Sequence, residues 1–539
     1  MSSSSSVSPV SIIPAPVSVW QFTGRHVLCA ETRILVAHSS LVSVAGYLQS
    51  VLRKVTGWTF EIIARDSEAA LPNSERVAAP HFHLAHTPSV ENPEGYRLRV
   101  ASQYVRIEAS APAGAFYAMQ TLLQLLPPVV HLARPRRDVA WTLPCLQIED
   151  APRFQWRGAM LDSCRHFQPV SFIYKFLDLL ALHKLNTFHW HLTEDQGWRI
   201  EIRKYPRLTE IGSRRAETVV GHNDFPLGGD GIPHGGFYTQ DEIRAIVAYA
   251  AERFITIVPE IEMPGHATAA IAAYPQFGCT LGHAPVEVAI GWGVFTNLYS
   301  PEEATFSFLQ DVLDEVLALF PSRYIHVGGD EAAKDQWLAS ESVQQRMCEL
   351  GVPDVHSLQS YFIGRMARFL DSRGRRLIGW DEILEGGLPD GTTVMSWRGT
   401  QGGIDAASAG HDVVMAPHQY TYFDSAQSLD SAIEPLAISG PLTLEKVYSF
   451  EPVPSQFTGQ PEKAARIMGV QAQIWTEYIP TPEHVEYMAF PRLSALAEVA
   501  WTSREKRDAG SFEEFRSRLV PFLKRLTLLG VRYRPLDLF

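Results

Sequence analysis

The sequence predicts an α/β protein whose main part is a (β/α)8 TIM barrel, preceded by a smaller α+β domain. The chain has 539 residues, more than one ordinary hydrophobic core accommodates. After about residue 151, near-continuous apolar runs alternate with helical patterns, as expected for strands that are buried on both faces of a parallel sheet. Acidic and aromatic residues gather where these runs end, which is where barrels of this class carry their functional groups.

Composition and charge restrict the class of protein. Hydrophobic residues make up 46% and charged residues 20% of the chain, values that are typical of a globular protein. The net charge of -12 argues against a nucleic-acid partner, which would favour a basic surface. No apolar run reaches the roughly 18 residues of a transmembrane helix, so we expect no contact with a membrane.

The cysteines and the first residues bear on the compartment. The 5 cysteines are odd in number and lack metal or redox spacing, so we expect mostly buried free thiols in a reducing compartment. The opening stretch MSSSSSVSPV has neither a basic nor an apolar region of a signal peptide. The sequence therefore favours the cytoplasm over the periplasm or secretion.

The first part of the chain is expected to hold a flexible leader and an accessory domain. Residues 1–20 read as the leader, and residues 21–150 as an α+β domain with no catalytic constellation. Strands are predicted at 33–37, 96–101 and 104–109, and a helix at 113–126. A break at Ala151-Pro152 separates this domain from the barrel domain, residues 151–539.

Eight apolar runs are predicted as the barrel strands: 157–163, 186–192, 255–263, 324–329, 376–380, 392–397, 412–417 and 468–475. Helices are predicted at 170–185, 240–254, 301–320, 356–372 and 484–501, and those between the fifth and seventh strands look short or irregular. The third helix has a marked start, with Ser300 as the expected N-cap, Pro301 in the first turn and Glu303 three residues after the cap.

The residues at the strand ends suggest a sugar pocket. Tryptophan rings pack against the apolar faces of pyranoses, while carboxylates and arginine bind hydroxyl groups. Residues of these types, together with His266 and Tyr422, follow the predicted strands: Asp162, Arg165, Glu194, Asp195, Glu260, Glu262, Asp330, Glu331, Trp380, Asp381, Glu382, Trp397, Arg398, Asp424, Trp475 and Glu477.

Asp330 and Glu331 are adjacent acids, and neighbours in a strand point to opposite faces. Both can reach one site only where the strand has ended. Most glycoside hydrolases place two carboxyls on opposite sides of the scissile bond. A neighbouring pair suits another division of labour, in which one acid protonates the leaving oxygen and the other orients a nucleophile that belongs to the substrate.

The stretch HVGGDE, residues 326–331, resembles the signature of family 20 glycoside hydrolases, the β-N-acetylhexosaminidases. Further stretches resemble motifs of this family in the family's order: RGAMLDSCRHF, NTFHWHLTEDQGWRIEI, VPEIEMPGH, GWDEIL, SWRG, TYFDSAQ and QIWTE. They extend from about residue 155 to about residue 480, and the N-terminal domain resembles the accessory domain that often precedes this barrel.

The resemblance implies exo-acting hydrolysis of terminal, non-reducing β-linked GlcNAc or GalNAc in an oligosaccharide or glycoconjugate. In this family the substrate's 2-acetamido oxygen attacks the anomeric carbon with retention, through an oxazolinium intermediate. Glu331 is expected to act as general acid and then as base. Asp330 is expected to accept the acetamido N–H and balance the developing charge, and Tyr422 to hold the acetamido oxygen.

The resemblance also assigns the remaining site residues. Arg165, Asp424 and Glu477 are expected to bind hydroxyls, the tryptophans 380, 397 and 475 to wall the pocket, and Asp195, His266 and His326 to support the acid pair. It implies no metal and no cofactor, and we expect a monomer or a homodimer. Glu194 stands where the family frequently has Asp, and the glycine-rich segment 205–237 is expected to shape the leaving-group side.

Other interpretations stay open at this stage. Asp330-Glu331 could be solvated acids at a helix N-terminus, and the tryptophans could be core residues. A metal-dependent hydrolase could use His189 and His191, which share a strand face, although the pattern of a third ligand is absent. A non-catalytic sugar-binding protein could use the same barrel. The sequence leaves the choice between GlcNAc and GalNAc, the linkage and the aglycone undecided.

Overall fold

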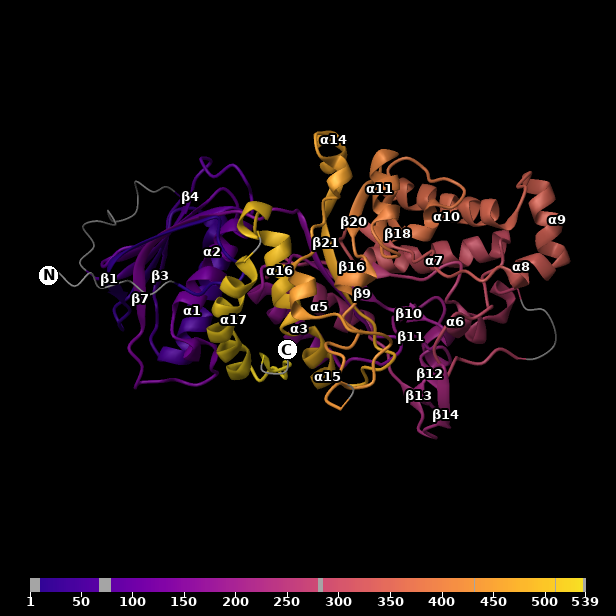
Figure 1. Cartoon of the computed structure of the whole chain (residues 1–539), viewed down its shortest axis with the longest axis horizontal. Helices are drawn as coiled ribbons and strands as arrows, with labels where there is room; N and C mark the ends of the chain where they lie inside the picture. The colour runs from indigo at the N-terminus through magenta and orange to yellow at the C-terminus, as the bar shows by residue number, and fades with distance from the viewer. Residues whose placement is uncertain (1–9, 67–78, 280–284, 431, 509, 537–539) are drawn as a thin grey trace.

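A computed structural model describes residues 10–66, 79–279, 285–430, 432–508 and 510–536. The N-terminal domain and the barrel lie side by side along the longest axis of the molecule (Figure 1). Among the described residues, no helix has both the length and the apolar character needed to cross a membrane.

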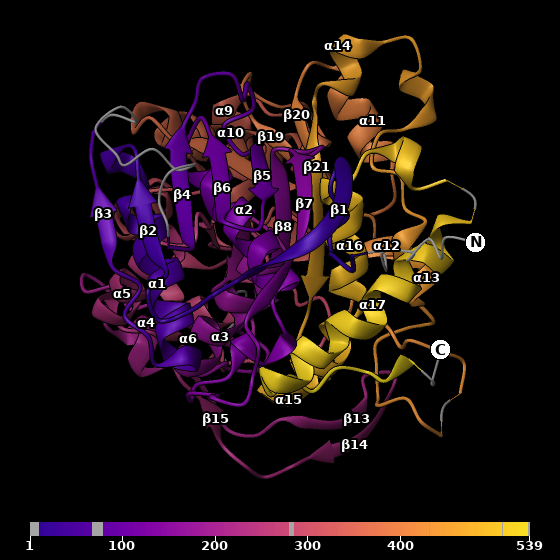
Figure 2. The ribbon, with the colours of Figure 1, turned by 90° about the vertical axis from the view of Figure 1, so that its left-hand side faces the viewer.

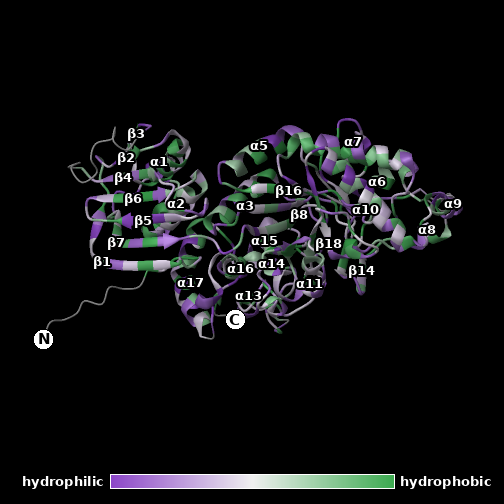
Figure 3. Cartoon of the chain, turned by 90° about the horizontal axis from the view of Figure 1, so that it is seen from above, coloured by the Kyte–Doolittle hydropathy of each residue, from purple (hydrophilic) through white to green (hydrophobic). Residues whose placement is uncertain are grey.

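The N-terminal domain is a sheet of 7 strands in the order β1-β7-β5-β6-β4-β2-β3. Buried and partly buried residues alternate along β6, the period-two pattern of a strand with one face on a core. Hydrophobic and hydrophilic residues also alternate along β5 to β7 in Figure 3. The elements are β1 (Ser18–Val27), β2 (Arg33–Val36), β3 (Ile62–Ala64), β4 (His81–His86), β5 (Tyr96–Val100), β6 (Tyr104–Ala109), β7 (Thr142–Asp150), α1 (Val42–Thr56) and α2 (Pro112–Leu125).

The sequence located part of this domain. The three predicted strands and the predicted helix are present as β2, β5, β6 and α2, while β1, β3, β4, β7 and α1 were not predicted. Residues 10–20 differ from the expected leader, because Ile12 and Ile13 are buried and β1 already begins at Ser18. The backbone N–H of Ile13 donates to Gln124 Oε1 at 2.9 Å. The rest of the predicted leader, residues 1–9, lies outside the described residues.

The second domain is a closed parallel barrel in the order β16-β17-β18-β19-β20-β21-β8-β9. All eight predicted strands are confirmed. Every residue of β8 and β21 is buried, as the continuous apolar runs predicted. The strands are β8 (Trp156–Asp162), β9 (Thr187–His191), β16 (Thr256–Glu260), β17 (Tyr324–His326), β18 (Arg376–Trp380), β19 (Thr393–Ser396), β20 (Asp412–Met415) and β21 (Ile467–Ile474).

Helices cover the outside of the barrel. Four of the predicted helices are confirmed as α3 (Val170–Leu182), α5 (Gln240–Ala251), α7 (Glu303–Leu319) and α10 (Val355–Ser372). The connections between the fifth and seventh barrel strands are short, as predicted, with η5 (Asp381–Leu384) and α11 (Gln401–Ser408).

Two details of the helix prediction were wrong. The helix predicted at 484–501 is two helices, α15 (Pro482–Ala489) and α16 (Arg492–Trp501), because Pro491 has no N–H to continue the hydrogen-bond ladder. The predicted cap at Ser300 is also absent. Glu302 is the N-cap of α7 and makes no side-chain cap bond, while the Ser300 hydroxyl lies 2.7 Å from that of Thr305.

The C-terminal helix α17 (Ser511–Leu528) packs against the N-terminal domain (Figure 2). The Arg525 guanidinium donates to the carbonyls of Leu123, Gln124 and Leu126 at the end of α2. Asp150, at the end of β7, accepts from Lys184 Nζ at 3.0 Å and from Trp501 Nε1 at 2.9 Å. These buried contacts join the accessory sheet to the base of the barrel.

Candidate active site

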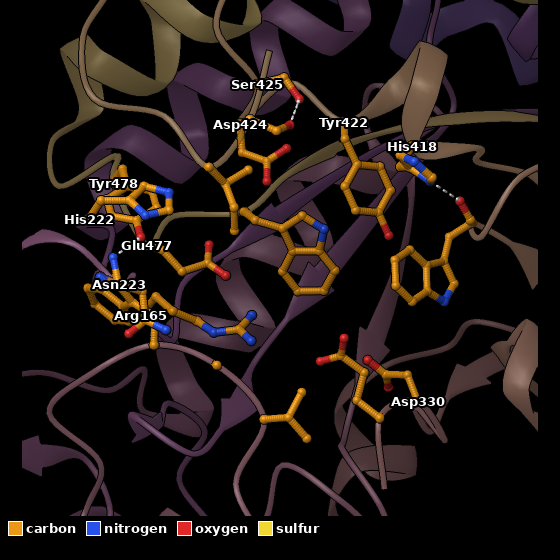
Figure 4. Close-up of a pocket in the computed structure, with 18 of the residues that line it drawn as sticks. Arg165, His222, Asn223, Asp330, His418, Tyr422, Asp424, Ser425, Glu477 and Tyr478 are labelled. Carbon is orange, nitrogen blue, oxygen red and sulfur yellow. Dashed lines mark hydrogen bonds between the residues drawn. The ribbon is translucent and has the colours of Figure 1, made fainter. Parts of the chain in front are cut away.

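The carboxyl ends of the barrel strands surround a pocket of about 440 Å³ (Figure 4). Ten residues that the sequence suggested line it together: Arg165, His266, Asp330, Glu331, Trp380, Trp397, Tyr422, Asp424, Trp475 and Glu477. The predicted supporting residues Asp195 and His326 are fully buried and lie outside the pocket lining.

The turn that carries the acid pair explains why two neighbouring carboxylates face one pocket. β17 ends at His326, and the next residues turn through left-handed conformations, with φ of 65° at Gly328, 91° at Gly329 and 45° at Glu331. Only glycine takes such angles freely. The turn brings Glu331 Oε2 to 3.4 Å and Asp330 Oδ2 to 3.6 Å from the same nitrogen, His266 Nε2.

His266 holds a positive charge beneath the acid pair. Its Nδ1 lies 2.6 Å from Glu194 Oε1 and 2.8 Å from Asp195 Oδ2. Burial by itself lowers the pKa of His266, but the charge of Glu194 and the hydrogen bond to Asp195 raise that pKa overall, well above its ordinary value. The expected support of the acid pair by Asp195 and His266 therefore has a direct geometric basis, and Glu194 shares it.

Three carboxylates of the pocket keep a buried oxygen without a hydrogen-bond partner among the described residues: Asp330 Oδ1, Asp424 Oδ1 and Glu477 Oε2. Burial raises the pKa of Asp330 to about 7, helped by the nearby acids and opposed by His266. Burial and the charge of Glu477 raise the pKa of Asp424 to about 8. Buried polar atoms are normally paired, so these oxygens indicate that a polar ligand completes the site.

The aromatic residues form a wall with fixed rings. Trp397 and Tyr422 stack with centroids 5.9 Å apart and an interplanar angle of 18°. The indole N–H of Trp380 donates to Glu260 Oε1 at 2.9 Å, and that of Trp397 to Glu382 Oε2 at 2.9 Å. These bonds lock the ring orientations, so the tryptophans are at once largely buried and part of the pocket surface.

Arg165 points its guanidinium into the pocket in Figure 4. Its Nη2 lies 3.1 Å from Glu194 Oε2, and its Nε donates to Gln196 Oε1 at 3.1 Å. The guanidinium also lies over the Trp475 ring, 5.0 Å from its centroid. These contacts fix a planar cation at the side of the pocket that Glu477 shares.

The histidines of the metal alternative lie below the pocket, in the barrel interior. His189 and His191 are fully buried and do not line the pocket. His191 Nδ1 lies 2.5 Å from Glu260 Oε2, and His189 Nε2 lies 2.9 Å from the same oxygen. His326, which was expected to support the acid pair, contacts Glu260 instead, with its Nδ1 2.7 Å from Oε1.

Five groups of described residues bring potential metal-binding atoms close together, and two of them bear on the predicted site: His189, Glu260 and His326 in the barrel interior, and His266, Asp330 and Glu331 at the pocket. In both groups the same atoms face one another as imidazole–carboxylate pairs.

Other predicted strand-end residues hold loops rather than line the pocket. Asp162 Oδ1 accepts from the N–H of Cys164 at 2.7 Å, and Asp381 Oδ2 accepts from the N–H of Trp397 at 3.1 Å. Glu262 is buried beside Gly328. Burial and the charge of Asp330 raise the pKa of Glu262 well above its usual range.

Sequence reasoning missed a group of lining residues: His222, Asn223, Asp224, Trp292, Gly293, Val294, His418, Ser425, Ile438, Ser439 and Tyr478. Tyr478 directly follows Glu477, so its place after the eighth strand was a usable signal. The segment 205–237, which was expected to shape the leaving-group side, supplies three of these lining residues, at 222–224. Trp292 lies in an irregular stretch whose sequence has no periodic pattern.

The chain matches two family models, the catalytic domain of glycosyl hydrolase family 20 over residues 154–504 and domain 2 of the same family over residues 10–151. A β-hexosaminidase from Porphyromonas gingivalis is 44% identical over 528 residues, which cover 97% of this chain and 64% of the relative. The chain thus spans less than two thirds of that relative's length.

Solved structures are similar over the whole chain. An exo-β-N-acetylglucosaminidase of family 20 from Vibrio harveyi, in complex with N-acetylglucosamine, has a TM-score of 0.82 at 33% identity, covering 98% of this chain and 79% of the other. A family 20 β-N-acetylhexosaminidase from Streptomyces coelicolor has a TM-score of 0.81 at 30% identity, covering 97% of each chain.

Proposed function

The chain belongs to glycosyl hydrolase family 20, and on that premise we propose that it is an exo-acting β-N-acetylhexosaminidase. It removes terminal, non-reducing β-linked GlcNAc or GalNAc by substrate-assisted retaining catalysis. One observation carries the proposal: Asp330, Glu331 and Tyr422 line one pocket whose remaining walls suit a single sugar. Support comes from the relatives, which include a β-hexosaminidase and an exo-β-N-acetylglucosaminidase.

In the first step Glu331 protonates the glycosidic oxygen as its bond to the anomeric carbon breaks. The acetamido carbonyl oxygen of the substrate attacks that carbon and closes an oxazolinium ring. The side chain of Glu331 is 38% exposed, so it can reach both the leaving group and the water that follows. In the second step Glu331 takes a proton from this water, which opens the ring and restores the acid.

Asp330 and Tyr422 act on the acetamido group. The free Oδ1 of Asp330 accepts the acetamido N–H and balances the positive charge that develops on the ring nitrogen. The Tyr422 hydroxyl donates to the acetamido oxygen and holds it for attack. His266 lies close to both acids, so its positive charge stabilises Asp330 as a carboxylate, and Glu331 after it has given up its proton.

The hydroxyl groups of the sugar face the other side of the pocket. Arg165 donates to them, and the free oxygens of Asp424 and Glu477 accept from them. Trp475 and the other aromatic residues cover the apolar ring face. The volume of about 440 Å³ lies at the small end of ligand pockets, which suits one sugar.

The proposal is tested with p-nitrophenyl β-N-acetylglucosaminide in buffer that contains EDTA. We expect release of p-nitrophenol that EDTA leaves unchanged, and NMR of the first sugar product should show the β-anomer, since the reaction retains configuration. Loss of activity with EDTA would favour the metal-dependent alternative. Tight binding of N-acetylglucosamine without release of any aglycone would favour a sugar-binding protein.

A further inference from the structure

The side of the pocket opposite the acid pair is closed by the turn of an exposed hairpin. Strand β13 (Val219–His222) pairs with β14 (Phe225–Gly229), and His222, Asn223 and Asp224 at the turn line the pocket. In Figure 4, His222, Asn223 and Tyr478 lie beside Arg165 and Glu477, while Asp330 lies on the other side of the cavity.

Direct contacts hold this turn in place. The N–H of Asn223 donates to the Tyr478 hydroxyl at 2.9 Å. The rings of His222 and Tyr478 stack with centroids 5.4 Å apart and an interplanar angle of 9°, and Trp292 meets Tyr478 edge-on at 6.5 Å. Tyr478 directly follows Glu477, so the residue that holds the turn and a proposed sugar-binding carboxylate are neighbours in the backbone.

The rest of the hairpin buries little surface. All residues of β14 are exposed, and the side chains of Phe225 and Leu227 stand 77% and 81% exposed. Burial of apolar area is the main source of stability, so a hairpin with this exposure contributes little to holding the barrel together. Apart from the turn at the pocket, the base of the hairpin is tied to the neighbouring chain by the N–H of Val219, which donates to the carbonyl of Ile290 at 2.9 Å.

The orientation of the sugar, which rests on the proposed function, gives the turn and Tyr478 a role. Glu331, Asp330 and Tyr422 act at the anomeric carbon and its neighbour, C2. In a pyranose C4 lies across the ring from the anomeric carbon, so O3 and O4 face Arg165 and Glu477. A second sugar attached at O3 or O4 would extend into the space that His222, Asn223 and Tyr478 occupy.

We propose that His222, Asn223 and Tyr478 form a specificity wall that rejects sugars substituted at O3 or O4 and so restricts the enzyme to one terminal residue. Removing the wall makes the enzyme release a disaccharide whose reducing sugar is N-acetylglucosamine. The segment 205–237 was expected to shape the leaving-group side; this proposal puts its pocket-lining turn at the non-reducing side.

The test uses p-nitrophenyl glycosides of galactosyl-β-1,4-N-acetylglucosamine and of its β-1,3 isomer. Galactose has no acetamido group, so substrate-assisted hydrolysis cannot remove it first. Release of p-nitrophenol therefore reports release of the intact disaccharide, which mass spectrometry identifies. The glycoside of N-acetylglucosamine alone is measured in parallel and reports whether each variant is folded and active.

Two variants remove the wall in different ways. The first replaces residues 219–229 with two glycines, since the flanking residues already meet: the N–H of Asp230 donates to the carbonyl of Thr218 at 2.9 Å, and the N–H of Thr218 to Asp230 Oδ1 at 2.9 Å. The second, His222→Ala with Tyr478→Ala, keeps the backbone and decides the matter should the truncation not fold. The control is Phe225→Ser with Leu227→Ser, on the exposed strand.

The measured quantity is the ratio of kcat/KM for a disaccharide glycoside to kcat/KM for the monosaccharide glycoside. In the two wall variants we expect this ratio to be about 100-fold higher than in wild type. The control should match wild type. A wall variant that cleaves the monosaccharide glycoside and releases no disaccharide overturns the proposal. A wild-type enzyme that cleaves the disaccharide glycosides as well as the monosaccharide glycoside also overturns it. A change confined to the choice of aglycone also overturns it. Failure of the wild type on the monosaccharide glycoside counts against the proposed function instead.

Discussion

Glu331 and Asp330 are neighbours in the sequence, yet the left-handed backbone at Gly328, Gly329 and Glu331 lets both carboxylates approach one imidazole. The sequence contained the acids and the glycines, and the resemblance assigned the roles. The conformation of the turn could not be predicted from the sequence, because the φ angles of these three residues depend on how the strand end packs in the fold. The same holds for Glu194, whose part in fixing both His266 and Arg165 depends on distant segments meeting.

At Glu331 we expect that substitution by Gln slows hydrolysis in proportion to the need for protonation. Glycosides with basic, alkyl leaving groups should lose about 100- to 10,000-fold in kcat/KM, the usual contribution of general acid catalysis. Aryl glycosides with acidic leaving groups should lose much less in the first step. Rates measured over a series of leaving-group pKa values check this. Equal losses across the series would contradict the acid role.

At Asp330 the raised pKa of about 7 sets a pH dependence. The proposed role needs the carboxylate, so kcat/KM should fall as the pH drops through about 7 and the group takes up a proton. Asp330→Asn should remove this limb of the profile and weaken inhibition by a thiazoline that mimics the cyclic intermediate. An unchanged acidic limb, or unchanged inhibition, in the variant would refute the role.

Asp424 links function to stability. Burial raises its pKa to about 8, above the value of an unfolded carboxyl. The folded state therefore loses stability as the pH rises from about 4 to about 8, because it then holds a disfavoured buried charge. Asp424→Asn cannot ionise, so we expect its Tm to exceed that of wild type by about 2–5 °C at about pH 9, with no gain at about pH 4.

Thermal melting of Asp424→Asn and wild type at both pH values measures this difference. KM for the p-nitrophenyl glycoside should rise in the variant, since Asn cannot accept hydroxyl hydrogen bonds as a carboxylate does. A lower Tm at the higher pH would contradict the buried charge.

At the scale of elements, the apolar runs predicted all eight barrel strands, because parallel strands buried on both faces need continuous hydrophobic sequence. The ends of the helices were predicted less accurately than the strands. Pro491 divides the helix predicted at 484–501, and the sequence marked Ser300 as a cap where the chain uses Glu302. The β13–β14 hairpin escaped prediction because β13 is short and only partly buried and β14 is exposed, so no periodic burial pattern marks the two strands.

The turn after β17 is the element on which the chemistry depends. A Cβ at Gly328 would lie 1.6 Å from Glu262 Oε2, so Gly328→Ala must move the turn or Glu262. We expect kcat/KM to fall by at least about 100-fold, as misplacement of catalytic groups by about 1 Å does. Gly351→Ala is the matched control: φ is 66° there, close to the 65° of Gly328, and nothing lies within 4 Å of the added Cβ.

Both glycine variants place alanine at nearly the same positive φ, so the backbone strain is similar in the two. Activity assays together with melting temperatures therefore separate the effect of this strain from the effect of displacing the turn. Gly351→Ala should lose stability alone. Should Gly328→Ala keep full activity, the close approach of this turn to Glu262 would be irrelevant to the acid pair.

At the scale of the whole molecule, the two domains share a buried interface that sequence patterns did not reveal. Residues 10–20 and α17 come from opposite parts of the chain, and both pack at α2 of the accessory domain. These contacts join residues 111 and 402 positions apart, and local periodicity carries no information on such pairs. Within the part of the chain that the structure describes, the pocket lining contains no residue of the accessory domain.

The measurement that tests the account most directly compares hydrolysis of p-nitrophenyl β-N-acetylglucosaminide with that of the plain p-nitrophenyl β-glucoside. The two substrates share the leaving group and differ in the 2-acetamido group. We expect cleavage of the first alone, because in the proposed mechanism the nucleophile is the acetamido oxygen, held by Asp330 and Tyr422. Equal cleavage of both would mean that the protein supplies the nucleophile, and would contradict the roles proposed for Asp330 and Tyr422.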